Sequence, residues 1–134
     1  MRIEWSDAYK IGNAAIDAQH ETWFERINNF LTAPDGDSLT QCETLMQQYT
    51  RDHFQHEESL MRAVNYPAVD DHLSQHKKLL KYLSEISQQI ANDSLDRVVL
   101  KKFLSNWLLS HIRVHDTKLA NYVIFNSAKK SPAG

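Results

Sequence analysis

Seven histidines offer the most chemistry in this sequence, and they fall in clusters. They occupy positions 20, 53, 56, 72, 76, 111 and 115 of the 134-residue chain. Two pairs of donors stand four residues apart, His53 with Glu57 and His72 with His76. Positions four apart in an α-helix lie only about 40° from each other, so each pair can direct two donor atoms at one point. Imidazole binds iron, zinc, copper and nickel, and a carboxylate can bridge two cations, so the pattern predicts a metal site.

Four helical segments are expected to position these donors. Apolar residues recur at steps of three and four, and the expected helices run from about Asn13 or Asp17 to Leu31, from Ser38 to about Val64, from about Val69 to Ala91, and from about Leu95 to His115 or beyond. Ser38 and Gln41 fit a capping box, and residues 92–94 offer caps for the fourth helix. Short loops between long amphipathic helices predict an all-α, antiparallel up-down-up-down four-helix bundle.

The two ends of the chain differ from the helical middle. Residues 1–12 read as an extended N-terminal arm that packs along the bundle, because they are apolar but too short and irregular for another helix. The arm carries Ile3, Trp5, Tyr9 and Ile11. We therefore predict one domain over residues 1–126 and a flexible tail or linker over residues 127–134.

Composition excludes several classes of function. The net charge is -2 and there is no run of one sign, which gives no electrostatic case for nucleic acid or a membrane surface. No signal peptide and no stretch of about 18 apolar residues is present. Cys42 is the only cysteine, so no internal disulfide can form and a reducing cytoplasm is the expected compartment.

The axial positions of the donors predict one shared site. His53 and Glu57 lie shortly before the turn between the second and third helices, and the third-helix pair lies shortly after it. His20 stands near the start of its helix and His111 near the end of its own, which an antiparallel bundle brings to the same level. A single histidine on an apolar face is more often a packed core residue, but this many at one level are hard to explain in that way.

Two other metal proteins are poor matches. A ferritin-like di-iron oxidase uses Glu-x-x-His on two helices, and no glutamate in this chain is followed three residues later by histidine. A zinc hydrolase commonly uses three protein ligands and one water, and the clustered imidazoles here are too many.

The sequence resembles the hemerythrin family from Glu4 to Tyr122. The matching elements are Trp5 with Tyr9, Ile16-Asp17-Ala-Gln-His20, His53-Phe54-Gln-His-Glu57-Glu58, His72-x-x-x-His76, and His111-Ile112 with Asp116. The resemblance implies reversible binding of dioxygen, for storage, delivery or sensing, at a centre of two iron ions with a bridging oxo or hydroxo group. It implies no enzymatic activity.

The resemblance also implies a ligand set. His72, His76 and His111 would bind one iron, His20 and His53 the other, and Glu57 and Asp116 would bridge the two. Five imidazoles, two bridging carboxylates and the bridging oxygen supply eleven of the twelve bonds that two octahedral irons need. The vacant position would then fall on the iron with two histidines. The resemblance implies a dry pocket beside this position, lined by Trp23, Phe54, Trp107, Leu108 and Ile112. The alternative is that these residues only pack in the core. Trp23 stands where the family more often has leucine.

Spacing and resemblance disagree on the fourth helix. Spacing alone selects His115, four residues after His111, whereas Asp116 would point about 140° away on an ideal helix. We follow the family pattern because a second bridging carboxylate is needed and a helix that loosens near its end would swing Asp116 inward. His56 is expected at the surface or behind a ligand, and Glu58 in solvent.

The physiological role stays open at this level. The chain fits either an oxygen carrier or an oxygen or redox sensor domain excised from a longer signalling protein, in which the polar end of the chain is a linker to an output domain.

Overall fold

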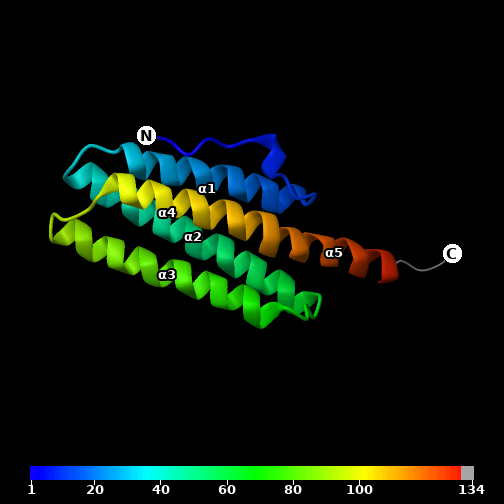
Figure 1. Cartoon of the computed structure of the whole chain (residues 1–134). Coiled ribbons are helices and arrows are strands. Elements are labelled where there is room, and N and C mark those ends of the chain that lie inside the picture. Colours follow the sequence, from blue (N-terminus) through cyan, green and yellow to red (C-terminus); the bar gives the residue numbers. More distant parts are fainter. Residues whose placement is uncertain (131–134) are drawn as a thin grey trace.

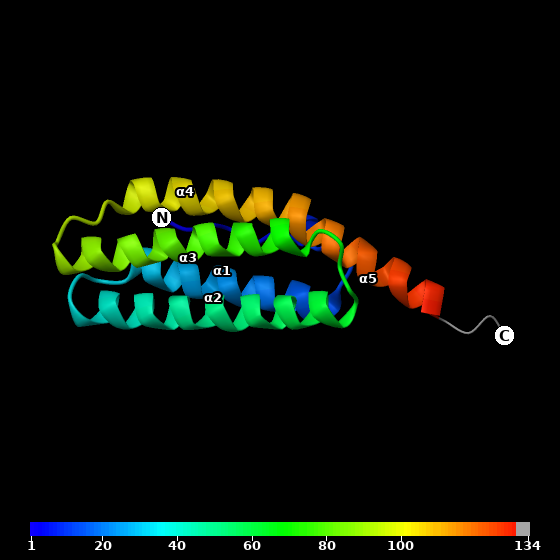
Figure 2. The same ribbon diagram turned by 90° about the horizontal axis from the view of Figure 1, so that it is seen from below.

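Four long helices pack side by side in an up-down-up-down bundle (Figure 1; Figure 2). The computed structural model describes residues 1–130. Its long helices are α1 (Ala14–Thr32), α2 (Asp37–Ala63), α3 (Val69–Ala91), and a fourth rod in which α4 (Arg97–Ser110), the π-helix η2 (His111–Asp116) and α5 (Thr117–Lys130) follow without a break. Every regular element in these residues is helical, which confirms the predicted all-α four-helix bundle. None of the described helices is both long and apolar enough to cross a membrane.

The fourth rod is longer than the sequence pattern indicated. α5 projects past the loop between α2 and α3 in both views (Figure 1; Figure 2). His111 therefore lies in the middle of a continuous rod, and the prediction that it lies near a helix end is wrong. The predicted tail starts at residue 127, where the chain is still in the last turn of α5. Residues 131–134 of that predicted tail lie outside the described residues.

Polar side chains cap two of the helices. The Asn13 side chain accepts a hydrogen bond from the Ile16 amide at the start of α1. At the start of α4, Asp96 accepts from the amides of Val98 and Val99. Asp96 therefore takes the capping role that the sequence suggested for residues 92–94. An oxygen that accepts from the first free N–H groups stabilises a helix by about 1 kcal/mol.

α2 begins in another way. Its N-cap is Gly36, whose φ of 96° lies in the region that glycine adopts without steric cost. Helix begins at Asp37, so Ser38 is already inside it, and the helix has no side-chain cap. The predicted capping box of Ser38 and Gln41 is thus wrong.

Two apolar clusters fill the bundle. The larger runs along most of its length and includes Phe24, Phe30, Leu83 and Leu104. The smaller lies under α5 and comprises Met61, Tyr66 and Leu119 with their partly buried neighbours. Along α2, Phe54 belongs to the first cluster and Met61 to the second. The predicted metal donors on α2 therefore fall at the boundary between the two.

The N-terminal arm runs along α1, as predicted (Figure 1). The Ile3 amide donates to the Asn28 side chain at 2.6 Å, and the Asn28 amide group donates back to the Ile3 carbonyl at 2.8 Å. Trp5 meets the Phe24 ring edge-on at 5.3 Å. One short 3₁₀ helix, η1 (Asp7–Tyr9), interrupts the otherwise extended arm.

Candidate metal centre

All seven predicted metal ligands meet in one buried cluster near the end of the bundle at which α1 begins. α1 supplies His20, α2 supplies His53 and Glu57, α3 supplies His72 and His76, and η2 supplies His111 and Asp116. Each of the seven is at most 2% exposed. They form two groups that share Glu57, and in each group the donor atoms lie within 4.8 Å of one another. The predicted convergence at one level of the bundle is therefore present.

The Glu57 carboxylate divides its two oxygens between the two sides of this cluster. Oε1 lies 3.0 Å from His76 Nε2 and 3.2 Å from His72 Nε2. Oε2 faces the other way and lies 3.5 Å from His53 Nε2. One carboxylate thus joins a pair of α3 imidazoles to an α2 imidazole.

Asp116 is divided in the same manner. Its Oδ1 lies 3.1 Å from His111 Nε2 and 3.2 Å from His72 Nε2, whereas its Oδ2 lies 3.0 Å from His20 Nε2. Three imidazoles therefore face one oxygen from each carboxylate, and two imidazoles face the other oxygens. This is an arrangement in which two carboxylates can each bridge two adjacent cations.

Many of the polar atoms in this cluster lack a hydrogen-bond partner. They include both ring nitrogens of His20 and of His111, His53 Nε2, Glu57 Oε2 and both oxygens of Asp116. A buried polar atom without a partner costs folding free energy, so such atoms are rare in native proteins. Because these atoms face shared centres, bound cations would satisfy them. The residues present therefore fit a metal centre.

The charges in the cluster depend on one another. Burial raises the pKa of Asp116, but the charge of His111 and the close imidazole nitrogens of His111, His20 and His72 outweigh it and hold that pKa well below its usual range. Burial alone would lower the pKa of His72, but the adjacent carboxylates of Asp116 and Glu57 raise it to about 9. For His53 burial prevails and lowers the pKa to about 4. Neutral His53 presents the lone pair that a metal requires, whereas a metal must displace a proton from His72.

A π-helical turn brings Asp116 into the cluster. In η2 the Thr117 amide donates to the Ile112 carbonyl five residues earlier, and the Thr117 hydroxyl donates to the same carbonyl at 3.0 Å. This wider turn places His111 and Asp116, five residues apart, on the same side of the rod, and π-helical turns often occur at functional sites. His115, which α-helical spacing selects, is half-buried and lies outside both donor groups. Its ring stacks on the His111 ring at 5.4 Å.

Gln19 orients one of the imidazoles. Its Oε1 lies 2.7 Å from His53 Nδ1, and an amide oxygen can only accept, so Nδ1 carries the proton and Nε2 faces the centre as a lone pair. The Gln19 amide nitrogen in turn donates to Nδ1 of the exposed His56 at 3.1 Å. Gln19 belongs to the motif that resembles the family around His20, but no role was predicted for it from the sequence. Glu58, expected in solvent, is half-buried with an oxygen 3.8 Å from His76 Nδ1.

Trp23 closes the side of the cluster that has two imidazoles. It is fully buried, with its ring centre 5.1 Å from that of His53 and 6.2 Å from that of His20. Its indole N–H donates to the Thr50 hydroxyl at 2.8 Å. Thr50 is also fully buried and was missed by sequence reasoning, because the bond joins two helices. The indole thus presents its ring, and not its donor, to the cluster.

The other predicted pocket residues lie around the same centre. Phe54 stacks on the His76 ring at 3.7 Å, and Trp107 stacks on the His111 ring at 4.5 Å. Leu108 and Ile112 are completely buried. All belong to or pack against the larger apolar cluster, so they contribute to the core.

Comparison with known proteins adds evidence of a different kind. Residues 12–123 match the family model described as the hemerythrin HHE cation binding domain. Bacteriohemerythrin of Stenotrophomonas maltophilia is 32% identical over 126 residues, which cover 90% of this chain and 81% of the relative. Hemerythrin of Phascolopsis gouldii is 25% identical over 114 residues, covering 85% and 87% of the two chains.

A solved structure supports the fold. The crystal structure of a wild-type hemerythrin superimposes with a TM-score of 0.79 at 22% identity and covers 90% of this chain and 97% of that one. The family match spans most of the chain and includes every donor of the cluster. This chain belongs to the hemerythrin family of cation-binding domains.

Proposed function

We propose that this chain binds molecular oxygen reversibly at a centre of two iron ions. The proposal rests on the orientation of two carboxylates, Glu57 and Asp116. Each directs one oxygen toward the group of three imidazoles and its other oxygen toward the group of two. The relatives are named bacteriohemerythrin, myohemerythrin and hemerythrin, and none of these names is that of an enzyme.

The proposed ligands follow the two sides of the cluster. His72, His76 and His111 would hold one iron, and His20 and His53 the other, with Glu57 and Asp116 as bridges beside an oxo or hydroxo group. The iron pair would supply the electrons that dioxygen takes up and the coordination position at which it binds. The side with two imidazoles has fewer protein donors, so the ligand is expected there.

The protein residues would keep this reaction reversible by excluding protons and water. Trp23 covers the side with two imidazoles, and its indole N–H donates to the Thr50 hydroxyl. Gln19 holds His53 in the tautomer that binds a metal. Carboxylates with lowered pKa values stay ionised as bridges and do not act as proton donors. We place this activity in the cytoplasm, where a lone cysteine is kept reduced.

Anaerobic reconstitution with ferrous iron tests the proposal. We expect two irons per chain and a charge-transfer absorption that appears with oxygen, disappears when oxygen is removed and returns on re-exposure. Glu57→Gln should lose this cycle, whereas Gln55→Ala, a change at an exposed position two residues away, should keep it. Rapid irreversible bleaching would favour redox sensing over storage or delivery. Bound iron without oxygen-dependent colour, or two zinc ions without such colour in the protein as purified, would refute the proposal.

A further inference from the structure

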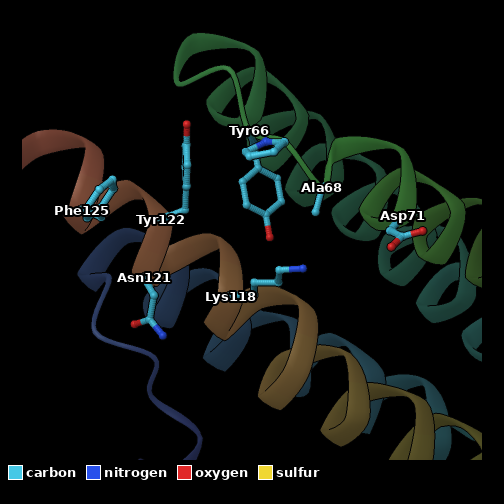
Figure 3. Close-up of a pocket in the computed structure, with 8 residues that line it drawn as sticks. Tyr66, Ala68, Asp71, Lys118, Asn121, Tyr122 and Phe125 are labelled. Atoms are coloured by element: carbon cyan, nitrogen blue, oxygen red, sulfur yellow. The ribbon is translucent and has the colours of Figure 1, made fainter. Parts of the chain in front are cut away.

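A pocket of about 670 Å³ lies between α5 and the loop that joins α2 to α3 (Figure 3). Tyr66 comes from the loop, and Tyr122 and Phe125 come from the part of α5 that extends beyond the bundle. Lys118 and Asp71 lie at the rim. None of these residues belongs to the proposed ligand set.

Tyr66 is the wall between this pocket and the metal centre. Its side chain is only 4% exposed, and its ring meets the His72 ring edge-on at 6.4 Å. Figure 3 shows its hydroxyl directed into the pocket, on the side where Lys118 lies. The hydroxyl forms no hydrogen bond with any described residue. Burial, together with the charges of Asp116 and Asp71, raises the pKa of Tyr66, so the group is a neutral O–H donor.

The remaining walls define the chemistry of a ligand. Tyr122 packs against Tyr66 with ring centres 5.3 Å apart, and Phe125 is 62% exposed beside it. Exposed aromatic rings of this kind favour a planar, aromatic partner. Lys118 forms no ion pair with a carboxylate of residues 1–130 and is free to meet an anionic group. Asp71, at the rim, can accept from N–H groups of the ligand.

We infer that this pocket binds a planar aromatic anion that donates electrons to the metal centre through Tyr66 and His72, the chemical class to which reduced flavin mononucleotide belongs. The electron-donating part of the inference rests on the proposed function. On the proposed function, a diferric centre would lack the electrons that dioxygen takes up, so a reductant would be needed to restore it. A donor stacked on the pocket walls is separated from a ligand imidazole by one tyrosine ring.

The step balances for a two-electron donor. The reduced flavin anion gives up two electrons and one proton and becomes the oxidised flavin. Two ferric ions held by the cluster would take one electron each and become ferrous, and the proton would leave to solvent through the open side of the pocket. No other oxidant or reductant is required.

Binding is tested first, on iron-free protein, by quenching of flavin mononucleotide fluorescence. Lys118→Gln should weaken binding by up to about fivefold, as expected for an exposed charge pair. Tyr66→Phe should weaken it roughly two- to tenfold through the loss of one hydrogen bond. Lys78→Gln, an exposed lysine in another surface hollow, should leave it unchanged. Riboflavin, which lacks the phosphate, should bind more weakly than the nucleotide and should not respond to Lys118→Gln.

Reduction is tested second, by anaerobic stopped flow on oxidised, iron-loaded protein. Reduced flavin mononucleotide should reduce the wild type faster than the Lys118→Gln variant, whereas dithionite, which is small and needs no pocket, should reduce both at the same rate. Equal loss of flavin binding in Lys118→Gln and Lys78→Gln, or no binding to the wild type, would overturn the inference while oxygen binding stands. Specific flavin binding by a chain that takes up no iron would instead refute the proposed function and the electron-donating role, and the binding site alone would stand.

Discussion

The π-helical turn of η2 can be tested by changing its length. Deletion of Val114, which is 57% exposed, would shorten the sequence separation of His111 and Asp116 from five residues to four. On an α-helix of radius about 2.3 Å, five residues displace a Cα sideways by about 4 Å, and four residues by only about 1.6 Å. The deletion should therefore convert η2 into a regular α-helix while Asp116 stays beside His111 and α5 keeps its register.

A second variant keeps the chain length and moves only the carboxylate. Exchange of the two residues, His115→Asp with Asp116→His, creates the four-residue spacing that a regular α-helix would favour. In the observed backbone, however, position 115 lies outside the donor groups. The backbone of η2 should not change into a regular α-helix in this variant. That change would rotate the buried Leu119 and Ala120 of α5 out of the core.

The assay is iron content together with oxygen-dependent absorption after reconstitution. The deletion variant should hold two irons and keep the oxygen spectrum. The exchange variant loses a bridging carboxylate, so we expect it to bind at most one iron. Its iron affinity should fall by more than the 10–100-fold loss that is typical when a residue hydrogen-bonded to a metal ligand is changed. Full iron loading and a native spectrum in the exchange variant would show that the π turn does not position the carboxylate.

Three further predictions concern residues around the centre. Gln19→Leu should lower iron affinity by about 10–100-fold in chelator competition, because nothing then orients the imidazole behind it, whereas Gln41→Leu at an exposed position should have no effect. Asn28→Ala should lower the free energy of unfolding in urea by about 2 kcal/mol through the loss of two hydrogen bonds to the arm, and a similar loss for the exposed Asn29→Ala would contradict this assignment. In iron-free protein, the raised pKa of His72 stabilises the fold fully below pH 6.5, its unfolded value, and this contribution is lost as the pH approaches 9. The free energy of unfolding should thus fall by roughly 2 kcal/mol between pH 7 and 9.5, and a His72→Gln variant that shows the same fall would disprove the cause.

Sequence periodicity predicted those features that depend on one helix at a time. The expected third helix, from about Val69 to Ala91, agrees with α3, because an apolar stripe and clear breaks define both ends. The two donor pairs at four-residue spacing also converge as expected. The start of α2 was misjudged, because the positive φ of Gly36 decides where that helix begins and leaves the nearby serine inside it.

Features that join different helices were harder to predict. The bonds from Trp23 to Thr50 and from His53 to Gln19 depend on how neighbouring helices are rotated, which no local pattern specifies. The inward position of Asp116 was predicted more from resemblance than from geometry, because α-helical periodicity assumes a constant 3.6 residues per turn and η2 departs from it.

The position of the centre between two unequal apolar clusters explains why its geometry needs support from several elements. The larger cluster lies on one side and fixes the relative positions of the four rods. On the other side only a small cluster, with Met61 and Leu119 completely buried, holds α5 against the bundle. η2 joins these two regions, and its carboxylate is completely buried among imidazoles from three rods. Cations that bind this carboxylate would therefore also hold α5 against the rest of the fold, so metal binding and the packing of this end of the molecule would stabilise each other.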